Sequence, residues 1–271
     1  MIIRADGDSL IVTKQVDHAG VSGVLASYWG NAEFPRPLPF ESIVYACGAH
    51  DEAWRHVDEE PILDRATGWP HTFMSMDLPT ILPAYLDGAD RVGRHDPFAG
   101  FLVMMHYQGF FNRRFGLDKG LPSRTVSKEE EAPVKAYMAA AEMLRGQLRS
   151  KAWEEKKEMA GDASSPAISH AYLILQIVDV ISLYLCLNPD HTWPLGDVRR
   201  TVGGPLVTMQ MSPIGPHLVR VQPWPFATKE GIEVTFPVRR IPNRQYSSTE
   251  DVRNTLRHAD NGSISFRIVS G

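Results

Sequence analysis

Four polar residues stand out because each lies in or beside an apolar stretch where burial is expected. His18 follows Gln15-Val-Asp, the pair His50-Asp51 ends the apolar segment 43–49, and Asp179 lies inside segment 173–187. A buried imidazole or carboxylate is costly without a partner, and a metal ion is one such partner. This nitrogen and oxygen donor set suits transition metals better than Ca²⁺. The sequence therefore predicts one or two divalent ions, Fe, Mn, Co, Ni or Zn, held by these four residues.

Three further residues are candidates for the same site. His106 lies in the apolar segment 101–111, so it is either a core histidine, a fifth metal ligand or an acid/base group. Glu52 follows the His50-Asp51 pair directly and could donate a proton to a leaving group. A second His-Asp pair, His95-Asp96, precedes a proline, and there we expect Asp96 to cap a helix and His95 to be solvated.

Composition and charge limit the class of protein. The 271-residue chain has 43% hydrophobic and 22% charged residues, a net charge of −4 and a pI near 6.2. These values give no general electrostatic reason to bind nucleic acid or an anionic membrane, so we expect a small-molecule partner. The two cysteines, Cys47 and Cys186, lie in apolar helical context, which indicates reduced thiols in a cytoplasmic protein. The charged N-terminus is unlike a signal peptide, and we expect segment 168–187 to be a buried core helix.

Helical periodicity and capping signals supply the elements that must position these residues. The chain is predicted to be helical over the ranges in which apolar residues recur at a spacing of three or four, bounded by Pro, Gly or a capping residue. A long helix rich in Ala, Glu and Lys is a candidate homodimer contact. The expected helices are 14–29, 41–56, 80–93, one that begins at Asp96-Pro97 and continues to 111, 127–160, 164–188 and a short one at 249–258.

Strand-like alternation is concentrated after residue 190. Segments 206–211, 217–221, 232–236 and 264–269 alternate at a period of two. Residues 1–13 are expected to form either a strand pair or a single extended lead-in, with a turn signal at Asp6-Gly7-Asp8. We therefore predict a mainly α fold, a helical bundle with a small C-terminal antiparallel β-sheet appendage. The predicted domains are a helical metal-binding domain over 1–189 and a β-rich subdomain over 190–271, to which the N-terminal strand could add.

The order of the four residues resembles the HD-domain superfamily of metal-dependent enzymes. Its signature is a His, then an adjacent His-Asp pair, then a distant Asp, matched here by His18, His50-Asp51 and Asp179 within residues 14–188. The resemblance implies an HD-like bundle and a metal-activated water that hydrolyses a phosphoester or a related small molecule. In that mechanism, His106 or Glu52 would protonate the leaving group. The resemblance also allows His71 to serve a second metal.

Other functions remain open. Some members of the superfamily are di-iron oxygenases with six ligands, for which His71 with His106 or His95 would be the additional histidines. A metal-binding regulatory module without turnover is a third alternative. The chain also resembles an uncharacterised bacterial domain family of unknown function, through motifs such as His50-Asp51-Glu-Ala-Trp54 and Gln222-Pro-Trp-Pro-Phe226.

An anionic substrate would need a cation that this sequence does not place beside Asp179. No Lys or Arg follows Asp179 within one helical turn. Lys14, Arg55 or the pair Arg113-Arg114 would have to contact a phosphate instead.

Overall fold

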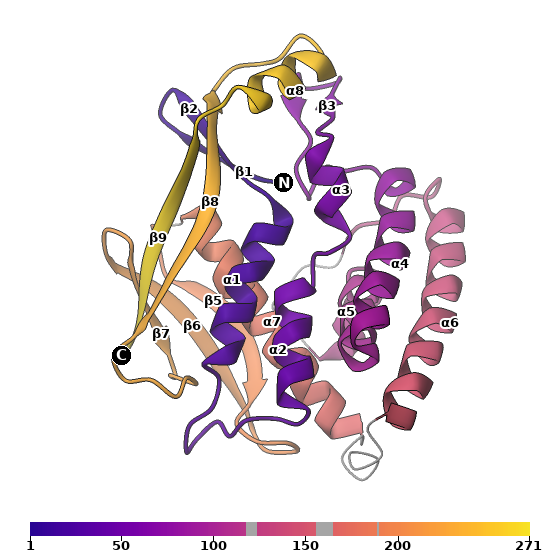
Figure 1. The fold of residues 1–271 in the computed structure, drawn as a ribbon, viewed down its shortest axis with the longest axis vertical. Coiled ribbons are helices and arrows are strands. Elements are labelled where there is room, and N and C mark those ends of the chain that lie inside the picture. Colours follow the sequence, from indigo (N-terminus) through magenta and orange to yellow (C-terminus); the bar gives the residue numbers. More distant parts are fainter. Residues whose placement is uncertain (118–123, 156–164, 189) are drawn as a thin grey trace.

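The fold combines a large curled sheet with a layer of helices (Figure 1). The computed structural model describes residues 1–117, 124–155, 165–188 and 190–271. About 47% of the chain is helical and 23% is in strands. The seven strands of the main sheet lie in the order β1-β2-β8-β9-β7-β6-β5, and a separate two-stranded sheet pairs β3 with β4.

The helices and strands of the described residues follow in chain order. The helices are α1 (Gln15–Ser27), α2 (Phe40–Ala49), α3 (Trp54–Glu59), α4 (Leu78–His95), α5 (Pro97–Gly109), the 3₁₀ helix η1 (Arg113–Gly116), α6 (Glu131–Glu155), α7 (Ser165–Leu187) and α8 (Thr249–Arg257). The strands are β1 (Ile2–Asp6), β2 (Ser9–Thr13), β3 (Leu63–Asp64), β4 (Trp69–Pro70), β5 (Trp193–Arg199), β6 (Leu206–Gly215), β7 (Leu218–Gln222), β8 (Ile232–Pro242) and β9 (Asn261–Ser270).

The main sheet joins the two ends of the chain. β1 and β2 form an antiparallel hairpin in which Ile2 pairs with Thr13, and β2 then pairs with β8 through Ser9 and Pro242. β7 and β9 run parallel, and the other neighbouring strands run antiparallel. The sheet therefore extends across the boundary expected at residue 189.

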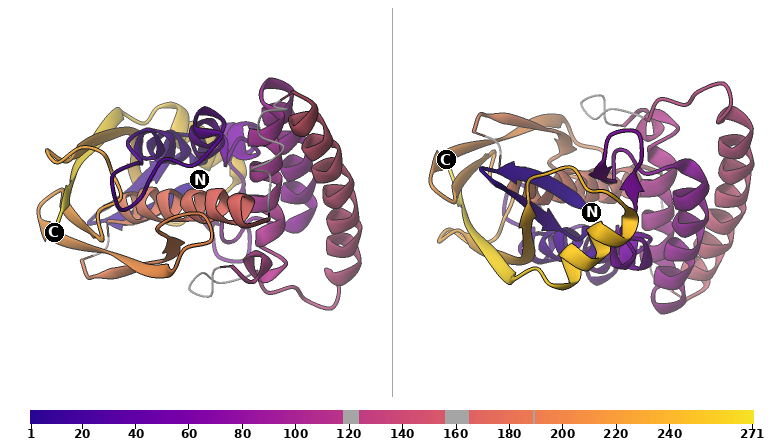
Figure 2. Two further views of the ribbon diagram at one scale, coloured as in Figure 1. Left: turned by 90° about the horizontal axis from the view of Figure 1, so that it is seen from below. Right: turned by 90° about the horizontal axis from the view of Figure 1, so that it is seen from above.

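The prediction of a mainly α helical bundle with a small sheet appendage is wrong. The sheet has seven strands and curls into a half-barrel, as the views along its edge show (Figure 2). Helices α1 and α7 contact it, α1 through β8 and α7 through β5 and β1. Segment 193–199, which forms β5, was not predicted as a strand, and the pairing of β2 with β8 joins segments more than 200 residues apart. Local alternation reports no such pairing, so it underestimated the size of the sheet.

The residues that start and end individual helices and strands were predicted better than the architecture. Asp96 caps α5 by accepting a hydrogen bond from Ala99 N at 3.0 Å, as its position before a proline predicted. The segment 1–13 is the expected strand pair, and α8 begins and ends close to the predicted helix 249–258. The predicted helix 41–56 is instead divided, because α2 ends at Ala49 and α3 begins at Trp54. The last part of the predicted helix 127–160, residues 156–160, lies outside the described residues.

The predicted core helix is mostly buried. In the described part of the chain, Pro166–Leu187 is the one helix that is long and apolar enough to cross a membrane, and 83% of its apolar window is buried. A core helix meets the same criteria of length and composition, so this feature is weak evidence for a membrane span.

Helices α4 and α5 touch through backbone alone at one point. A Cβ atom on Gly100 of α5 would lie 2.6 Å from the backbone nitrogen of Gly93 on α4. Every residue of α5 is buried, so this close approach fixes where its side chains, including His106, are placed.

Gly100→Ala should therefore lower the free energy of unfolding by about 1–3 kcal/mol, since backbone would have to move. The matched control is Gly146→Ala at an exposed position of α6, where a new Cβ atom meets nothing within 4 Å. That substitution should stabilise the protein by about 0.5–1 kcal/mol through helix propensity. Urea unfolding of both variants measures the difference, and an equal effect of the two would contradict the close packing.

Candidate metal centre

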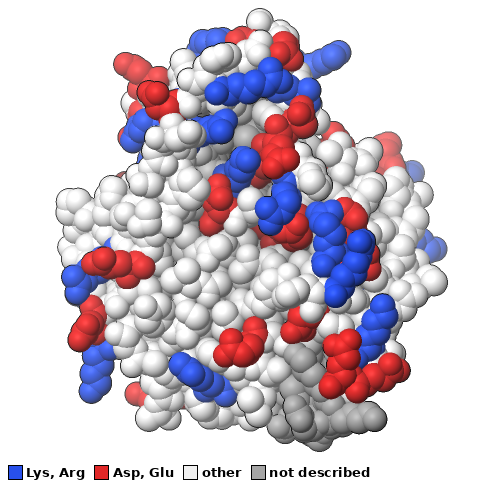
Figure 3. All heavy atoms as spheres, in the orientation of Figure 1, with Lys and Arg blue, Asp and Glu red and all other residues white. Residues whose placement is uncertain are grey.

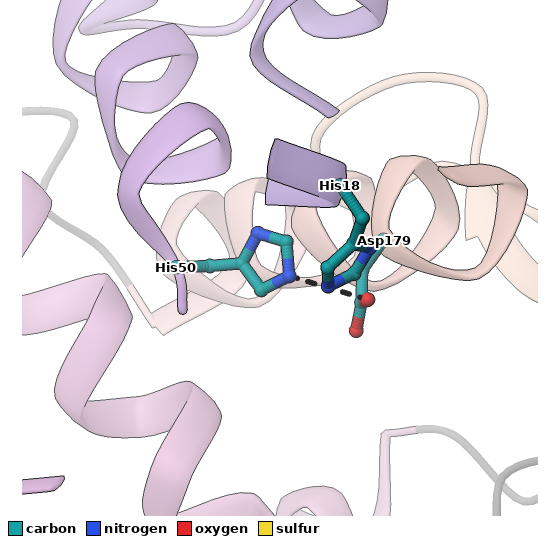
Figure 4. Close-up of side chains that lie close together, drawn as sticks. All are labelled: His18, His50 and Asp179. Carbon is teal, nitrogen blue, oxygen red and sulfur yellow. Dashed lines mark ion pairs between the residues drawn. The ribbon is translucent and has the colours of Figure 1, made fainter. Parts of the chain in front are cut away.

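Four of the candidate residues converge from three parts of the chain. His18 lies on α1, His50 is the C-terminal cap of α2, Asp51 follows in the turn before α3, and Asp179 lies on α7. The side chains of His18, His50 and Asp179 point toward one another (Figure 4). The cluster lies in the protein interior, because the His50 side chain is 0% exposed and that of Asp179 is 14% exposed.

A glycine contact brings the two histidines together. A Cβ atom on Gly23 of α1 would lie 2.8 Å from the Cα atom of Gly48 on α2, so the two helices meet backbone to backbone. The imidazole rings of His18 and His50 are consequently 5.0 Å apart, edge to face. Side chains larger than hydrogen at this crossing would separate the helices and the histidines with them.

The backbone fixes the tautomer of His50. Its Nδ1 lies 2.8 Å from the carbonyl oxygen of Cys47. A carbonyl only accepts hydrogen bonds, so Nδ1 carries a proton and the neutral ring keeps the lone pair on Nε2. Nε2 is buried, has no hydrogen-bond partner and lies 3.2 Å from Asp179 Oδ1. This arrangement is typical of metal-binding histidines, whose other nitrogen is held by a backbone carbonyl.

Ser182 has the same effect on His18. Ser182 Oγ donates to the backbone oxygen of Asp179 at 2.8 Å, so it accepts from His18 Nδ1 at 2.7 Å. The Nε2 lone pair of His18 then faces Asp51 Oδ2, 2.8 Å away. Two atoms that both attract a positive charge lie side by side here, and either a proton or a metal ion must be shared between them.

The distances are compatible with one ion. Two overlapping groups of three residues each have ligand atoms within 4.8 Å of one another. The first group is His18, His50 and Asp179, and the second is His50, Asp51 and His106. Bonds of about 2.1 Å allow opposite ligands to be about 4.2 Å apart, so small side-chain shifts would be enough. A divalent ion would also balance the two carboxylate charges of Asp51 and Asp179.

The pKa values show which residue of the metal-free cluster carries the proton that offsets the carboxylate charges. Burial alone would lower the pKa of His50, but the charges of Asp179 and Asp51 raise it to about 9. Burial would likewise raise the pKa of Asp179, and the charge of His50 instead holds it well below its usual range. Asp51 is shifted in the same direction by His50 and His18. The metal-free cluster therefore holds a proton on His50 at neutral pH.

His106 joins the cluster from α5. Its ring lies 5.0 Å from that of His50 and edge to face with it. Burial lowers the pKa of His106 to about 3, so the imidazole is neutral at physiological pH. Its Nδ1 lies 3.1 Å from Gln176 Nε2 on α7, one helical turn before Asp179.

Comparison with known proteins gives a family but no activity. Residues 1–243 match a protein family described as "Protein of unknown function (DUF3891)". The chain belongs to DUF3891. None of the curated proteins or solved structures matches it. The resemblance to the HD-domain superfamily is wrong, because the DUF3891 fold contains a large curled sheet and is not an HD helical domain. Four residues in a fixed order were too degenerate a pattern to identify that superfamily.

Three other candidates of this DUF3891 member lie outside the cluster. Glu52 forms an ion pair with Arg55 at 2.7 Å and with Arg91 at 3.3 Å. His71 is half-buried and contacts Ser75 in the connection that follows β4. His95 ends α4 and lies edge to face with the ring of Tyr45.

The cations proposed for an anionic substrate lie in two places. Lys14 and Arg55 line a cavity of about 520 Å³, together with Arg239 and Arg257 on the C-terminal side. Figure 3 shows basic and acidic side chains gathered around a hollow below the uppermost segment. No cluster residue lines this cavity. Arg114 instead lies next to the cluster, where it donates to Gln176.

One residue that holds the cluster was missed by sequence analysis. Gln15 donates from its side chain to Asp51 Oδ2 at 3.0 Å, and its backbone N–H donates to Asp58 at 2.6 Å. It precedes His18 by one helical turn and is buried, so a polar residue on the buried face of α1 was the available signal.

We expect the purified protein to bind about one divalent transition-metal ion per chain. His50→Gln and Asp179→Asn should each weaken binding by at least about 100-fold, and Ser182→Ala by about 10- to 100-fold, because it releases His18. His71→Ala and His95→Ala are matched controls, which should bind as the wild type does. Elemental analysis and titration against a chelating dye measure this, and equal affinity in all five variants would contradict the site.

Metal affinity should rise with pH between 6 and 9. His50 keeps its proton up to a pKa of about 9 in the metal-free protein, so an ion must displace that proton to bind. If one proton is released, the affinity should rise about tenfold per pH unit below that pKa. Above the pKa the affinity should no longer change with pH. Titrations at pH 6, 7 and 8 test the slope, and an affinity independent of pH would mean that no proton is released.

Proposed function

We infer that this protein is a metal-dependent hydrolase that activates water on a divalent ion held by His18, His50, Asp51 and Asp179. The observation that supports this most directly is the buried Nε2 atom of His50. The His50 ring is held by the hydrogen bond from Nδ1 to the Cys47 carbonyl, and Nε2 lies 3.2 Å from Asp179 Oδ1 in the interior. A buried imidazole nitrogen and a carboxylate this close must share a cation, either a proton or a metal ion.

The donor set favours an ion that can do acid and base chemistry near neutral pH. Two imidazoles with two carboxylates are ligands of Mn, Fe, Co, Ni and Zn. Cys47 is close to Asp179, but burial and that charge raise the pKa of its thiol, so it remains protonated and is a poor ligand. The proposed centre is therefore free of thiolate, unlike most structural zinc sites.

The exposed edge of the cluster gives the direction from which a substrate would approach. His18, His50 and Asp51 have side chains 2%, 0% and 5% exposed, and Asp179 is the most exposed at 14%. When bound, the ion would lower the pKa of a coordinated water and supply hydroxide near neutral pH. The carboxylate of Asp179 would help to hold the ion at this edge, and the buried apolar residues of α5 and α7 limit the access of other water.

The geometry gives less support to a di-iron oxygenase. Six protein ligands would be needed, and the described residues bring together three histidines and two carboxylates. The two additional histidines of that alternative, His71 and His95, lie outside the cluster. Hydrolysis at the metal centre is therefore the function that we propose.

The test is turnover by the metal-loaded full chain. We expect hydrolysis of at least one member of a panel of phosphomonoesters, phosphodiesters and carboxylic esters with Mn, Co, Ni, Zn or Fe. Asp179→Asn should lower kcat by about a thousandfold or more, and His95→Ala should leave it unchanged. Bound metal without turnover would favour a regulatory module. About two irons per chain with oxygen consumption would favour the oxygenase, and either result would overturn the hydrolase.

A further inference from the structure

His106 is held differently from the other two histidines of the cluster. The Nδ1 atoms of His18 and His50 face oxygen acceptors, which directs their Nε2 atoms at the carboxylates of Asp51 and Asp179. Nδ1 of His106 instead faces the side-chain amide of Gln176, with 3.1 Å between Nδ1 and Nε2 of the amide. The state of His106 therefore depends on which way this amide is oriented.

Arg114 orients the amide. Its guanidinium nitrogen lies 2.6 Å from Gln176 Oε1. A guanidinium has only donors, so the amide oxygen must face Arg114, and a rotated amide would place two donors against each other. The NH₂ group of Gln176 consequently points at His106 Nδ1, which has to accept. The proton of the neutral imidazole is then on Nε2.

Arg114 is a costly residue to keep in this position. It is 5% exposed, it stacks over the Phe110 ring at 4.5 Å, and its Nε atom has no hydrogen-bond partner. Arg113, Arg114 and Phe115 all have positive φ angles near 55°, a conformation that is unfavourable for residues other than glycine. Within the described residues, no carboxylate forms an ion pair with Arg114. A plain structural role does not require a buried guanidinium on a strained backbone, with a neutral amide as its acceptor.

We propose that His106 is a hydrogen-bond donor to the substrate and not a metal ligand, and that Gln176 and Arg114 are positioning residues that keep its proton on Nε2. His106 lies beside His50 and Asp51, so a donor there can reach an oxygen of a molecule bound at the ion. The catalytic role rests on the proposed hydrolase function, but the tautomer does not.

This assignment also defines the chemistry. A neutral imidazole that lost its Nε2 proton would become an imidazolate anion, so His106 donates a hydrogen bond and retains the proton. Such a donor stabilises negative charge that develops on an oxygen during attack by water. The substrate class that benefits has a carbonyl or phosphoryl oxygen, as in carboxylic and phosphoric esters. Gln176 and Arg114 act through His106 and need not touch the substrate.

The tautomer is measured directly by long-range proton–nitrogen NMR correlations on the metal-free, ¹⁵N-labelled full chain. We expect His106 to have its proton on Nε2, with its signals identified by their loss in His106→Gln. Wild-type His106 with its proton on Nδ1 would overturn the proposal. The measurement needs neither a metal nor a substrate.

Gln176→Glu reverses the arrangement with little change of shape. One carboxylate oxygen still accepts from Arg114, but the other now accepts from Nδ1, so the proton should move to Nδ1 and expose the Nε2 lone pair. The exposed residue Gln147 on α6 provides the matched control Gln147→Glu, which should leave the tautomer unchanged. An unchanged tautomer in a folded Gln176→Glu protein would contradict the positioning role. Arg114→Met should give a mixture of His106 tautomers, because nothing then orients the amide. The control Arg113→Met, at the exposed neighbouring residue, should not change the tautomer.

Metal binding and turnover separate this proposal from the hydrolase itself. His106→Gln should bind the ion within about twofold of wild type, whereas a ligand would lose about 100-fold, and such a loss would overturn the proposal. In Gln176→Glu, kcat should fall by about 100-fold while KM stays within about threefold. If the wild type binds metal without turnover but His106 has its proton on Nε2, the hydrolase function is contradicted. The positioning of His106 by Gln176 and Arg114 is then still supported.

Discussion

The structure depends on the burial of two carboxylates, Asp51 and Asp179, in the middle of an apolar core. Neither could remain ionised there without positive charge close by, and in the metal-free protein the protonated His50 supplies it. The glycine crossing of α1 and α2 and the end of α2 just before the His50-Asp51 pair are the two local features that bring these groups together. The helices are arranged around an electrostatic balance as much as around apolar contact.

Much of the local structure could be predicted from the sequence, and the architecture could not. Asp96 before a proline gave the start of α5, and Asp6-Gly7-Asp8 gave the first hairpin, because caps and turns depend on a few adjacent residues. The size of the sheet depends on pairing between segments such as β2 and β8, which lie more than 200 residues apart. No local pattern reports such a pairing, and the order of four polar residues then favoured the wrong superfamily.

The candidate site followed a similar division. Polar residues in apolar helices were sufficient to select His18, His50, Asp51, His106 and Asp179, since burial of such groups needs a partner wherever they meet. Sequence could not give their protonation, which is set by Ser182, the Cys47 carbonyl and the amide of Gln176. It also placed Glu52 beside the site by adjacency, although its carboxylate faces Arg55 and Arg91. Neighbours in sequence at the end of a helix point in different directions.

The pairing of β2 with β8 has a consequence for the order of events during synthesis. α1, which carries His18, follows β2 after a single residue, Lys14, and β2 is held in the sheet by β8. Until Ile232–Pro242 has left the ribosome, the first strand pair lacks its neighbour in the sheet and α1 lacks its contact with β8. Loop closure over such a distance is slow and comes late. The sheet that supports α1 is therefore completed only after all five polar groups of the cluster have been synthesised, because β8 follows each of them in the chain.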